Sequence, residues 1–393
     1  MKILLATESY YPNIDGGAIA QYNLMNELKA LGHEPIVIAP GKSFRNYSEE
    51  INGYKVYRTS SFPLPFYMNG RYRFSPFPFF KIRKIIKEIK PDIVHICSPY
   101  PIGGSAYIWA RKNDTPVISS IHILPENFLS PFLGSRHYKK FKDRFWKYLI
   151  YFFNFADWIT IPTKSGLDIY KKHGLKKNIT PISNGINTEI FNQNNDGEYL
   201  RKRFNLPKKN IVLTAGRMTP EKNLEVLINA IPFVINKINA HFLFVGSGGE
   251  YKQKLQNLVN ELKIDKFVTF TSFLEWKDYP NIFTISDIFT LPSEFELQSI
   301  VTLEAVASGL PVVVVNKGAL PELANSDNGF VFEPKNSKDL AEKIVTLLSD
   351  EKLKRQMSKN SLKLVKNHSL KSVAKQYLKA YENTIKVYQN KKQ

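Results

Sequence analysis

The stretch Asp287-Ile-Phe-Thr-Leu-Pro-Ser-Glu-Phe-Glu-Leu-Gln-Ser-Ile-Val-Thr-Leu-Glu-Ala-Val-Ala-Ser-Gly-Leu-Pro-Val-Val-Val-Val315 decides the fold of this chain. It predicts a short apolar strand, a polar loop, a buried helix that ends before Gly309, and a second buried strand over 312–315. Two acids interrupt the unit: Glu296 in the loop and Glu304 inside the helix. A glutamate in so apolar a helix is costly unless a group hydrogen-bonds it. The stretch therefore indicates either a structural partner for Glu304 or a ligand.

Similar strand and helix patterns alternate along the whole chain, which predicts parallel, doubly wound sheets. Such sheets bind their ligands at the carboxyl ends of the strands. A polar, basic stretch over 192–209 predicts a linker between two domains. The expected strands cover residues 3–6, 35–39, 93–97, 117–122, 159–163, 211–215, 242–245, 267–270, 288–291 and 312–315.

Composition sets outer limits on the function. A chain of 393 residues is long enough for two domains, and its net charge of +20 calls for an anionic partner such as a nucleotide, a nucleic acid or a membrane. The single Cys97 fits a reducing compartment, and the first residues read as a strand, not a signal peptide. No apolar run approaches the roughly 20 residues that span a bilayer. Gly246-Ser-Gly-Gly lacks the third glycine of a dinucleotide fingerprint, and no nucleic-acid motif accompanies the charge.

Two motifs carry a resemblance to a known family: Gly216-Arg-Met-Thr-Pro-Glu-Lys-Asn223 and the pair Glu296 and Glu304. Together they resemble the retaining group 1 glycosyltransferases of family 4, which include glucosyl-diacylglycerol synthases and phosphatidylinositol mannosyltransferases. The resemblance implies the GT-B fold, with two facing Rossmann-like domains. It places the acceptor domain at 1–190, the nucleotide-sugar domain at 191–372, and a last helix within 373–393 that returns to the first domain.

The resemblance also implies roles for individual residues. Arg217 and Lys222 would grip the donor diphosphate, Glu296 the donor sugar, and Glu304 the ribose. The alternatives are that Arg217 and Lys222 are solvated surface cations, that Glu296 is solvated, and that His122, at a strand end, is a structural hydrogen bonder. The catalytic residues implied are His122, Arg217, Lys222 and Glu296. The donor-binding residues implied are Gly16, Gly17, Asn184, Gly216, Arg217, Lys222, Gly246, Phe273, Ser299, Ile300, Val301 and Glu304.

Two further features bear on that site. The family's usual glycines after the first glutamate are replaced here by Leu297, Gln298 and Ser299. The sequence has no Asp-x-Asp motif, so we expect no metal clamp and no required cofactor; the cations and a helix N-terminus near Ser299 would stabilise the leaving diphosphate instead.

A basic amphipathic helix is expected over 135–153. Its aromatic and apolar positions recur at three- and four-residue steps and its other faces are basic, which is typical of a membrane-surface element. The alternative is an ordinary helix whose aromatics pack on the sheet. The expected membrane and acceptor contacts are Lys139, Lys140, Lys142, Arg144, Phe145, Trp146 and Lys147.

These observations favour a cytoplasmic enzyme, peripheral on the inner face of the cell membrane, that moves a hexose from a nucleotide sugar to a lipid. Glucose from UDP-glucose and a diacylglycerol-type acceptor are the preferred substrates. A UDP- or GDP-sugar acting on a saccharide or polyprenol-linked acceptor is the alternative. A sugar-nucleotide epimerase on the same fold and a catalytically silent partner subunit remain open as other classes.

Overall fold

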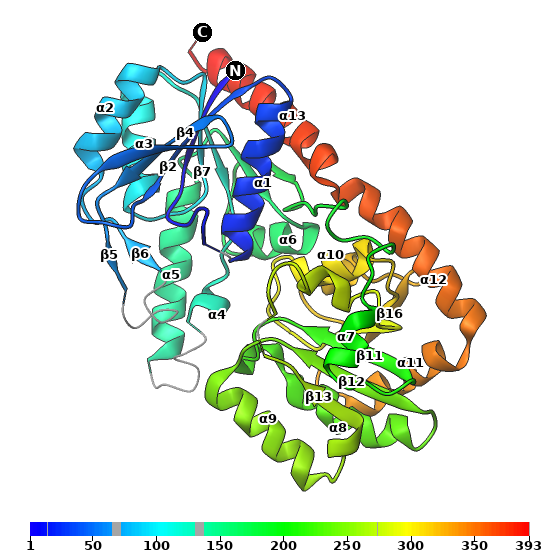
Figure 1. Ribbon diagram of the computed structural model, residues 1–393. Coiled ribbons are helices and arrows are strands. Elements are labelled where there is room, and N and C mark those ends of the chain that lie inside the picture. Colours follow the sequence, from blue (N-terminus) through cyan, green and yellow to red (C-terminus); the bar gives the residue numbers. More distant parts are fainter. Residues whose placement is uncertain (14, 65–71, 130–136, 273, 393) are drawn as a thin grey trace. The chain divides into compact units, whose positions relative to one another are not determined.

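The computed structural model forms two compact α/β units, each built on its own sheet (Figure 1). The first unit comprises Met1–Pro125, Phe132–Gly185 and Leu370–Gln393, and the second comprises Glu126–Pro131 and Ile186–Ser369. The residues that the structure describes are 1–13, 15–64, 72–129, 137–272 and 274–392.

The sheet of the first unit has eight strands in the order β10-β9-β8-β7-β1-β2-β4-β3. All neighbours pair in parallel except β3 and β4, which form an antiparallel edge. A separate two-stranded hairpin joins β5 and β6. The strands are β1 (Lys2–Ala6), β2 (Glu34–Pro40), β3 (Tyr47–Ile51), β4 (Tyr54–Thr59), β5 (Phe62–Pro63), β6 (Arg73–Phe74), β7 (Ile93–Ile96), β8 (Val117–Ser120), β9 (Trp158–Ile161) and β10 (Ile179–Pro181).

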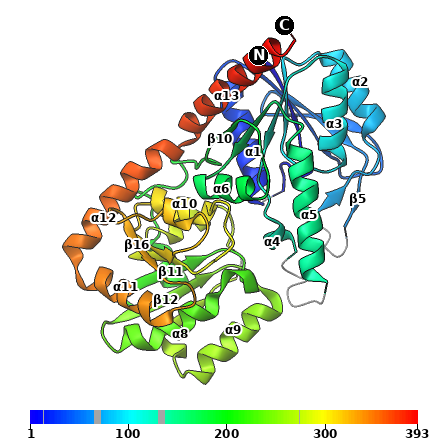
Figure 2. The same ribbon diagram turned by 180° about the vertical axis from the view of Figure 1, so that it is seen from behind.

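Alternating side chains of these strands build two apolar layers, because successive residues of a strand face opposite sides of the sheet. Ile3 and Leu5 pack with α1 and α13 on one face, whereas Leu4 and Ala6 pack with α2 and α3 on the other. The helices of this unit, also seen from behind in Figure 2, are α1 (Gly16–Ala30), α2 (Phe79–Ile89), α3 (Pro101–Lys112), α5 (Tyr138–Phe153), α6 (Lys164–Lys172) and α13 (Leu370–Asn390). The short helix α4 (Pro125–Phe128) begins at the last residue of a first-unit segment, and its other residues are assigned to the second unit.

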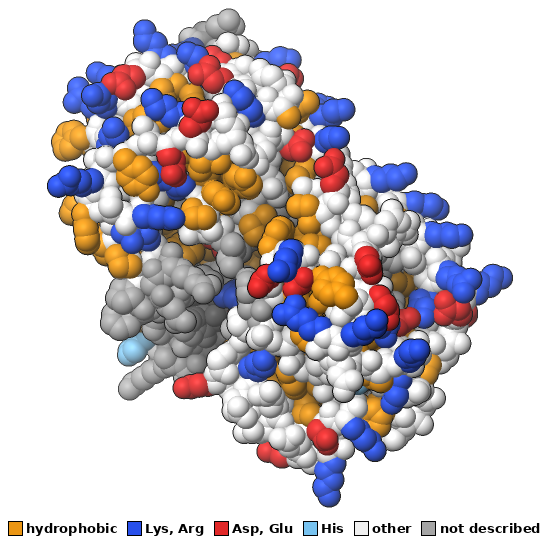
Figure 3. Space-filling model, viewed as in Figure 1, with side chains coloured by type: hydrophobic (Ala, Val, Ile, Leu, Met, Phe, Trp, Pro, Cys, Tyr) orange, Lys and Arg blue, Asp and Glu red, His pale blue; other side chains and the backbone are white. Residues whose placement is uncertain are grey.

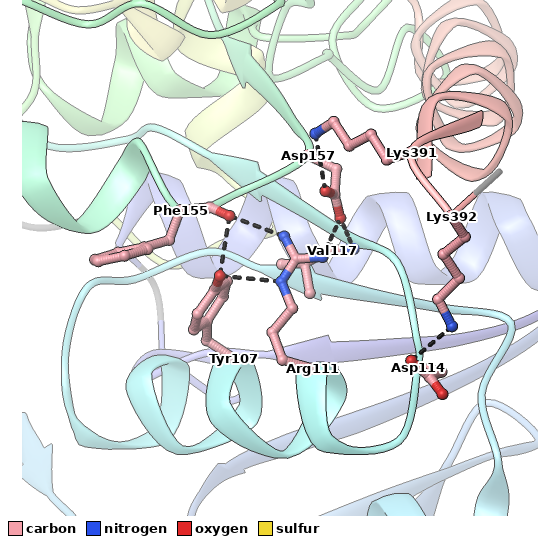
Figure 4. A network of polar contacts seen from close by, with 8 residues as sticks. All are labelled: Tyr107, Arg111, Asp114, Val117, Phe155, Asp157, Lys391 and Lys392. Carbon is pink, nitrogen blue, oxygen red and sulfur yellow. Dashed lines mark hydrogen bonds and ion pairs between the residues drawn. The ribbon is translucent and has the colours of Figure 1, made fainter. Parts of the chain in front are cut away.

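The C-terminal helix α13 belongs to the first unit, as the resemblance implied. Tyr377 and Tyr381 lie in its apolar core, and the Tyr381 hydroxyl lies 3.0 Å from Nδ1 of buried His95. The end of the helix is held by ion pairs (Figure 4): Lys391 Nζ lies 3.5 Å from Asp157 Oδ1, and Lys392 Nζ lies 2.6 Å from an oxygen of Asp114. Among these residues Asp157 is buried, and Arg111 also donates to it at 2.8 Å.

The second unit has six parallel strands in the order β13-β12-β11-β14-β15-β16. Its core is one cluster of apolar side chains from both faces of the sheet. The strands are β11 (Asn210–Ala215), β12 (Ala240–Val245), β13 (Val268–Phe270), β14 (Ile288–Leu291), β15 (Val312–Val315) and β16 (Gly329–Phe332). The helices are α7 (Glu198–Arg203), α8 (Leu224–Ile235), α9 (Gly249–Glu261), α10 (Ile300–Ala307), α11 (Ser337–Ser349) and α12 (Glu351–Leu364), with short 3₁₀ turns η3 (Pro220–Lys222), η4 (Asp265–Phe267), η5 (Tyr279–Ile282), η6 (Leu320–Glu322) and η7 (Val365–His368).

The stretch from Asp287 to Val315 folds as its sequence predicts. The β14 and β15 strands are fully buried, and α10 ends at Ala307, two residues before Gly309, whose φ of 80° is the left-handed conformation that stops a helix. The linker expected over 192–209 is wrong in part, because this stretch contains α7 and buries Leu200 in the core of the second unit. The division between the units also falls earlier than expected, at Gly185 and Ile186, since Ile186 and Phe191 pack into that same core.

Candidate active site

The second unit has its topological switch point between β11 and β14, where the strand order reverses. Open α/β sheets bind ligands at such a point, outside the carboxyl ends of the strands. The loop after β11 carries Gly216, Arg217 and Lys222, and the loop after β14 carries Glu296. The switch point therefore brings together the residues that the sequence singled out from both motifs.

An ion pair bridges this switch point. Lys222 Nζ lies 2.5 Å from Glu296 Oε1, and both side chains are mostly buried. Beside them, Asn223 Nδ2 donates to Glu294 Oε1 at 3.1 Å. Arg217 is exposed and lines a small hollow together with Lys222, Gly216 and the ends of β11 and β12. Two cations thus converge on the strand ends, and one of them is held by a carboxylate of the same site.

Two glycines, Gly216 and Gly246, allow the loops after β11 and β12 to approach each other closely. Gly216 has a φ of 125°, which side-chain-bearing residues rarely adopt. A Cβ on Gly246 would lie 1.9 Å from the carbonyl oxygen of Gly216, so the loops after β11 and β12 approach each other only because residue 246 is glycine. These contacts give Gly246 a packing role that its sequence pattern did not indicate.

Glu304 has the hydrogen-bonding partner that its apolar helix requires. The Tyr279 hydroxyl donates to Glu304 Oε2 at 2.7 Å, and Trp276 stacks on Tyr279 with ring centroids 6.2 Å apart. Burial raises the pKa of Glu304 from 4.5 to about 7, and the bond from Tyr279 opposes this only in part. Tyr279 and Trp276 were missed by sequence reasoning, because aromatic residues after a strand are usually core residues.

The start of α10 lies in the same loop region as Glu296. Ser299 is the N-cap, and its hydroxyl accepts from the Thr302 amide at 3.2 Å. The amides of the first turn, among them Ile300 and Val301, have no intrahelical acceptor, and such a helix start favours an anion. Leu297 and Gln298 are buried. The chain therefore keeps a capped helix N-terminus without the glycines that the family usually has here.

In the first unit, His122 follows β8 and Asn184 follows β10, and the two side chains are hydrogen-bonded. Burial lowers the pKa of His122 to about 4, so its imidazole is neutral near pH 7. Among the described residues, Nδ1 of His122 is buried without a hydrogen-bond partner. A neutral imidazole with a spare nitrogen suits a hydrogen bond to a polar ligand.

Gly16 and Gly17, which the resemblance implied at the donor, are the first two residues of α1. Asp15 caps this helix by accepting from the Ala18 amide at 3.0 Å, and Ser9 Oγ donates to the other carboxylate oxygen at 2.5 Å. The glycine pair thus presents a helix N-terminus after β1.

Glu8 is a buried acid of the first unit that sequence reasoning missed. It follows β1, next to the switch point between β1 and β7, and accepts from the Ser98 hydroxyl and from the Ile102 amide at 2.7 Å. Burial raises its pKa from 4.5 to about 7. The chain's own carboxylate therefore occupies the N-terminus of α3.

The basic helix α5 differs from expectation in one respect. Trp146 is buried and stacks on His173 with ring centroids 3.8 Å apart, so it is a core residue and no membrane contact. Phe145 and Lys142 are half-buried. The remaining members of the expected basic face, Lys139, Lys140, Arg144 and Lys147, are exposed. Phe273, which the resemblance implied as a contact of the donor's nucleotide base, lies outside the described residues.

Family models match both units. The model described as Glycosyl transferases group 1 matches residues 196–364, and the model described as Glycosyltransferase Family 4 matches residues 14–190. The chain belongs to the family 4, group 1 glycosyltransferases. It is therefore a glycosyltransferase, as its two motifs implied.

Known relatives and solved structures resemble the chain over most of its length. Sulfoquinovosyl transferase SQD2 from Arabidopsis thaliana is 29% identical over 84% of this chain and 62% of its own length. The alpha-monoglucosyldiacylglycerol synthase of Acholeplasma laidlawii is 25% identical over 92% of both proteins. Anabaena HepE, solved in complex with UDP, is 19% identical with a TM-score of 0.78 over 98% of this chain and all of its own, which supports the fold.

Proposed function

We propose that this glycosyltransferase moves a hexose from a nucleotide sugar onto a lipid acceptor with retention of the anomeric configuration. Glucose from UDP-glucose is the favoured donor and diacylglycerol the favoured acceptor. The observation that carries the proposal is the cationic switch point of the second unit, where Lys222 pairs with Glu296 and Arg217 lines the same small hollow as Lys222. The similarity to an alpha-monoglucosyldiacylglycerol synthase supports the choice of substrates.

The chemistry follows from charge. When the bond between the anomeric carbon and the diphosphate breaks, the departing oxygen gains negative charge, and preorganised donors stabilise that charge best. Arg217 and Lys222 are the cations at this place, and the first-turn amides of α10 add a helix N-terminus. A donor would share the Lys222 ammonium with Glu296, whose other oxygen would then orient a sugar hydroxyl.

Glu304 fits the ribose of the donor. Its carboxyl group is buried and accepts a hydrogen bond from Tyr279, and within the described residues no cation pairs with it. Such a group can accept hydrogen bonds from the neutral hydroxyls of a ribose. Because its pKa is raised, it carries less negative charge near pH 7 than an ordinary carboxylate and repels a nearby diphosphate less. The stacked Trp276 and Tyr279 rings lie beside it.

A transfer assay tests the proposal. The purified chain is incubated with UDP-glucose, UDP-galactose or GDP-mannose, together with diacylglycerol vesicles or soluble saccharides, and the products are read by NMR. We expect an α-linked hexosyl lipid from a UDP-sugar and none from an Arg217→Ala control. Transfer only to saccharides would move the acceptor away from lipids. An epimerised nucleotide sugar without transfer would indicate the epimerase alternative, and inertness with every donor would indicate a silent subunit.

A further inference from the structure

Three phenylalanines of the first unit are more exposed than any other large hydrophobic side chain of the described residues. Phe44 is 78% exposed, Phe77 is 88% exposed and Phe80 is 76% exposed. Phe44 lies in the loop after β2, and the other two lie just before and within the first turn of α2. Single exposed apolar residues are ordinary, but three phenylalanines this exposed on one unit call for a partner.

The segments that carry them are joined by hydrogen bonds. The amide of Ser61 donates to the carbonyl oxygen of Ser43 at 3.0 Å, which ties the loop of Phe44 to the chain after β4. The hydroxyl of Ser75 donates to the carbonyl oxygen of Ser60 at 2.8 Å, which brings in the segment that leads to Phe77. The phenylalanines therefore lie on adjoining segments of one surface, which we call the phenylalanine surface (Phe44, Phe77 and Phe80).

Folding does not account for these side chains. The core-facing side of α2 is supplied by Ile82, Ile85 and Ile86, all buried, while Phe79 packs on Trp109 with ring centroids 5.0 Å apart. Phe80, the next residue, lies edge-on to Phe79 with ring centroids 5.6 Å apart, but most of its side chain remains exposed. The helix thus has its full apolar face without the phenylalanine surface.

Cations predominate around the phenylalanine surface, and the one acid of α2, Glu88, pairs with Lys84 at 3.6 Å. Lys42 and Arg45 flank Phe44, and the stretch from Tyr72 to Lys87 contains no acid. Arg83 and Lys84 follow Phe80 and are exposed. Figure 3 shows hydrophobic side chains among Lys and Arg side chains, with some Asp and Glu between them, over the part of the first unit where α2 lies.

We propose that the phenylalanine surface inserts into the interface of an anionic lipid bilayer, as a contact separate from the basic helix α5. Aromatic side chains in the headgroup region, with cations beside them that meet anionic lipids, are the features of interfacial binding. A bilayer fits better than a folded protein partner, because the rings project from loops and a helix start between cations. The net charge of +20 favours the same anionic partner.

This inference rests on the lipid acceptor proposed above, but its test needs neither acceptor nor donor. Cys97 is the only cysteine of the chain and is buried, so a cysteine introduced on the surface can be labelled selectively. Phe77→Cys is labelled with a polarity-sensitive fluorophore. The matched control is Phe233→Cys, an exposed phenylalanine of the second unit with Lys338 over its ring at 5.7 Å. Vesicles contain phosphatidylglycerol and phosphatidylcholine without diacylglycerol.

We expect the label at position 77 to shift to the blue on adding vesicles and to be quenched by nitroxide-bearing lipids, with no change at position 233. No change at 77, or equal quenching at 77 and 233, would overturn the proposal. Phe77→Ser with Phe80→Ser should weaken vesicle partitioning by about tenfold or more, the scale of aromatic burial, whereas Phe233→Ser should not. Equal partitioning of the two variants would also overturn it.

The two proposals fail separately. Quenching at 77 without any transfer to lipid in the assay above would contradict the lipid acceptor and leave the insertion standing. Transfer to diacylglycerol dispersed in detergent, without quenching at 77, would contradict the insertion and leave the acceptor standing.

Discussion

At the scale of single residues, Arg217 and Lys222 serve the same diphosphate in our proposal but differ in their structural dependence. Arg217→Ala should cut turnover by about 10²-fold or more, because it removes a cation that stabilises the leaving diphosphate. Since Arg217 is exposed, the same change should leave the unfolding midpoint unchanged. Lys222→Ala should cut turnover similarly but also cost about 1–3 kcal/mol of stability, because it leaves the mostly buried Glu296 unpaired.

Denaturant titration of Lys222→Ala, Glu296→Gln and the double variant checks this second effect. The double variant should be more stable than Lys222→Ala alone, since no unpaired charge remains. Near-normal turnover in either single cation variant would contradict the diphosphate grip.

Glu304 makes the stability of the donor-free protein depend on pH. Its folded pKa of about 7 lies above the ordinary value of 4.5, so the folded state holds the proton more tightly. The free energy of unfolding therefore falls as pH rises from about 4.5 to 7, by up to ~3 kcal/mol for this group. Glu304→Gln keeps a partner for Tyr279 and removes the charge, so it should flatten that decline.

Denaturant titrations of both proteins between pH 4.5 and 8 measure the effect. Glu8 contributes a parallel decline, so the difference between the two proteins isolates Glu304. Identical pH profiles would contradict the raised pKa of Glu304.

At the scale of elements, the contact between the loops after β11 and β12 depends on Gly246. Gly246→Ala would place a Cβ against the Gly216 carbonyl at a residue with a φ of 143°, so the loop that carries Arg217 must move. We expect a loss of several kcal/mol of stability and weaker UDP binding. The control is Gly104→Ala in α3, where a Cβ meets nothing within 4 Å and a helical alanine stabilises by about 0.5–1 kcal/mol. Thermal unfolding and calorimetric UDP titration of both variants test this prediction. If Gly246→Ala kept the stability and the UDP affinity of Gly104→Ala, the packing role of Gly246 would be refuted.

The elements also show what the sequence could predict. Buried parallel strands such as Val312–Val315 and the glycine stop of α10 are local patterns, and the structure confirms them. The short helix α7 was hidden in a polar stretch because a single residue, Leu200, supplies its buried contact. The burial of Trp146 depends on His173 of another helix, and periodicity within α5 cannot reveal it. Hydrogen bonds between distant segments, such as Tyr279 to Glu304, leave no local pattern at all.

At the scale of the whole molecule, both units use a glutamate at the switch point of their sheet. In the second unit Glu296 holds Lys222 there, and in the first unit Glu8 binds the start of α3. Glu8 fills the N-terminus of α3 with the chain's own carboxylate. In our proposal the start of α10 instead faces the donor diphosphate, which is why we assign the nucleotide sugar to the second unit.

The same arrangement leads to a prediction about metals. In our proposal Arg217 and Lys222 stabilise the leaving diphosphate, and the sequence has no Asp-x-Asp motif, so transfer should continue in the presence of a chelator. Turnover with and without EDTA, followed by added magnesium or manganese, measures this. Loss of activity in EDTA that a divalent ion restores would contradict stabilisation by side chains alone.

The last prediction separates two causes of membrane binding: the exposed cations of α5, and the net charge of +20 of the whole chain. On α5, Lys139, Lys140, Arg144 and Lys147 are exposed, and each cation near an anionic bilayer contributes about 1 kcal/mol at low salt. Replacing all four with Glu should strongly weaken co-flotation with phosphatidylglycerol vesicles while leaving UDP binding intact.

The matched control replaces the exposed lysines of α12 and η7 in the second unit with Glu, giving the same change in net charge: Lys352, Lys359, Lys363 and Lys366. This control should still float with the vesicles, more weakly as salt rises, because the α5 cations remain. If both variants lose binding equally, net charge alone attracts the chain. If neither loses it, α5 is an ordinary helix whose lysines are solvated, the alternative that its aromatic spacing left open.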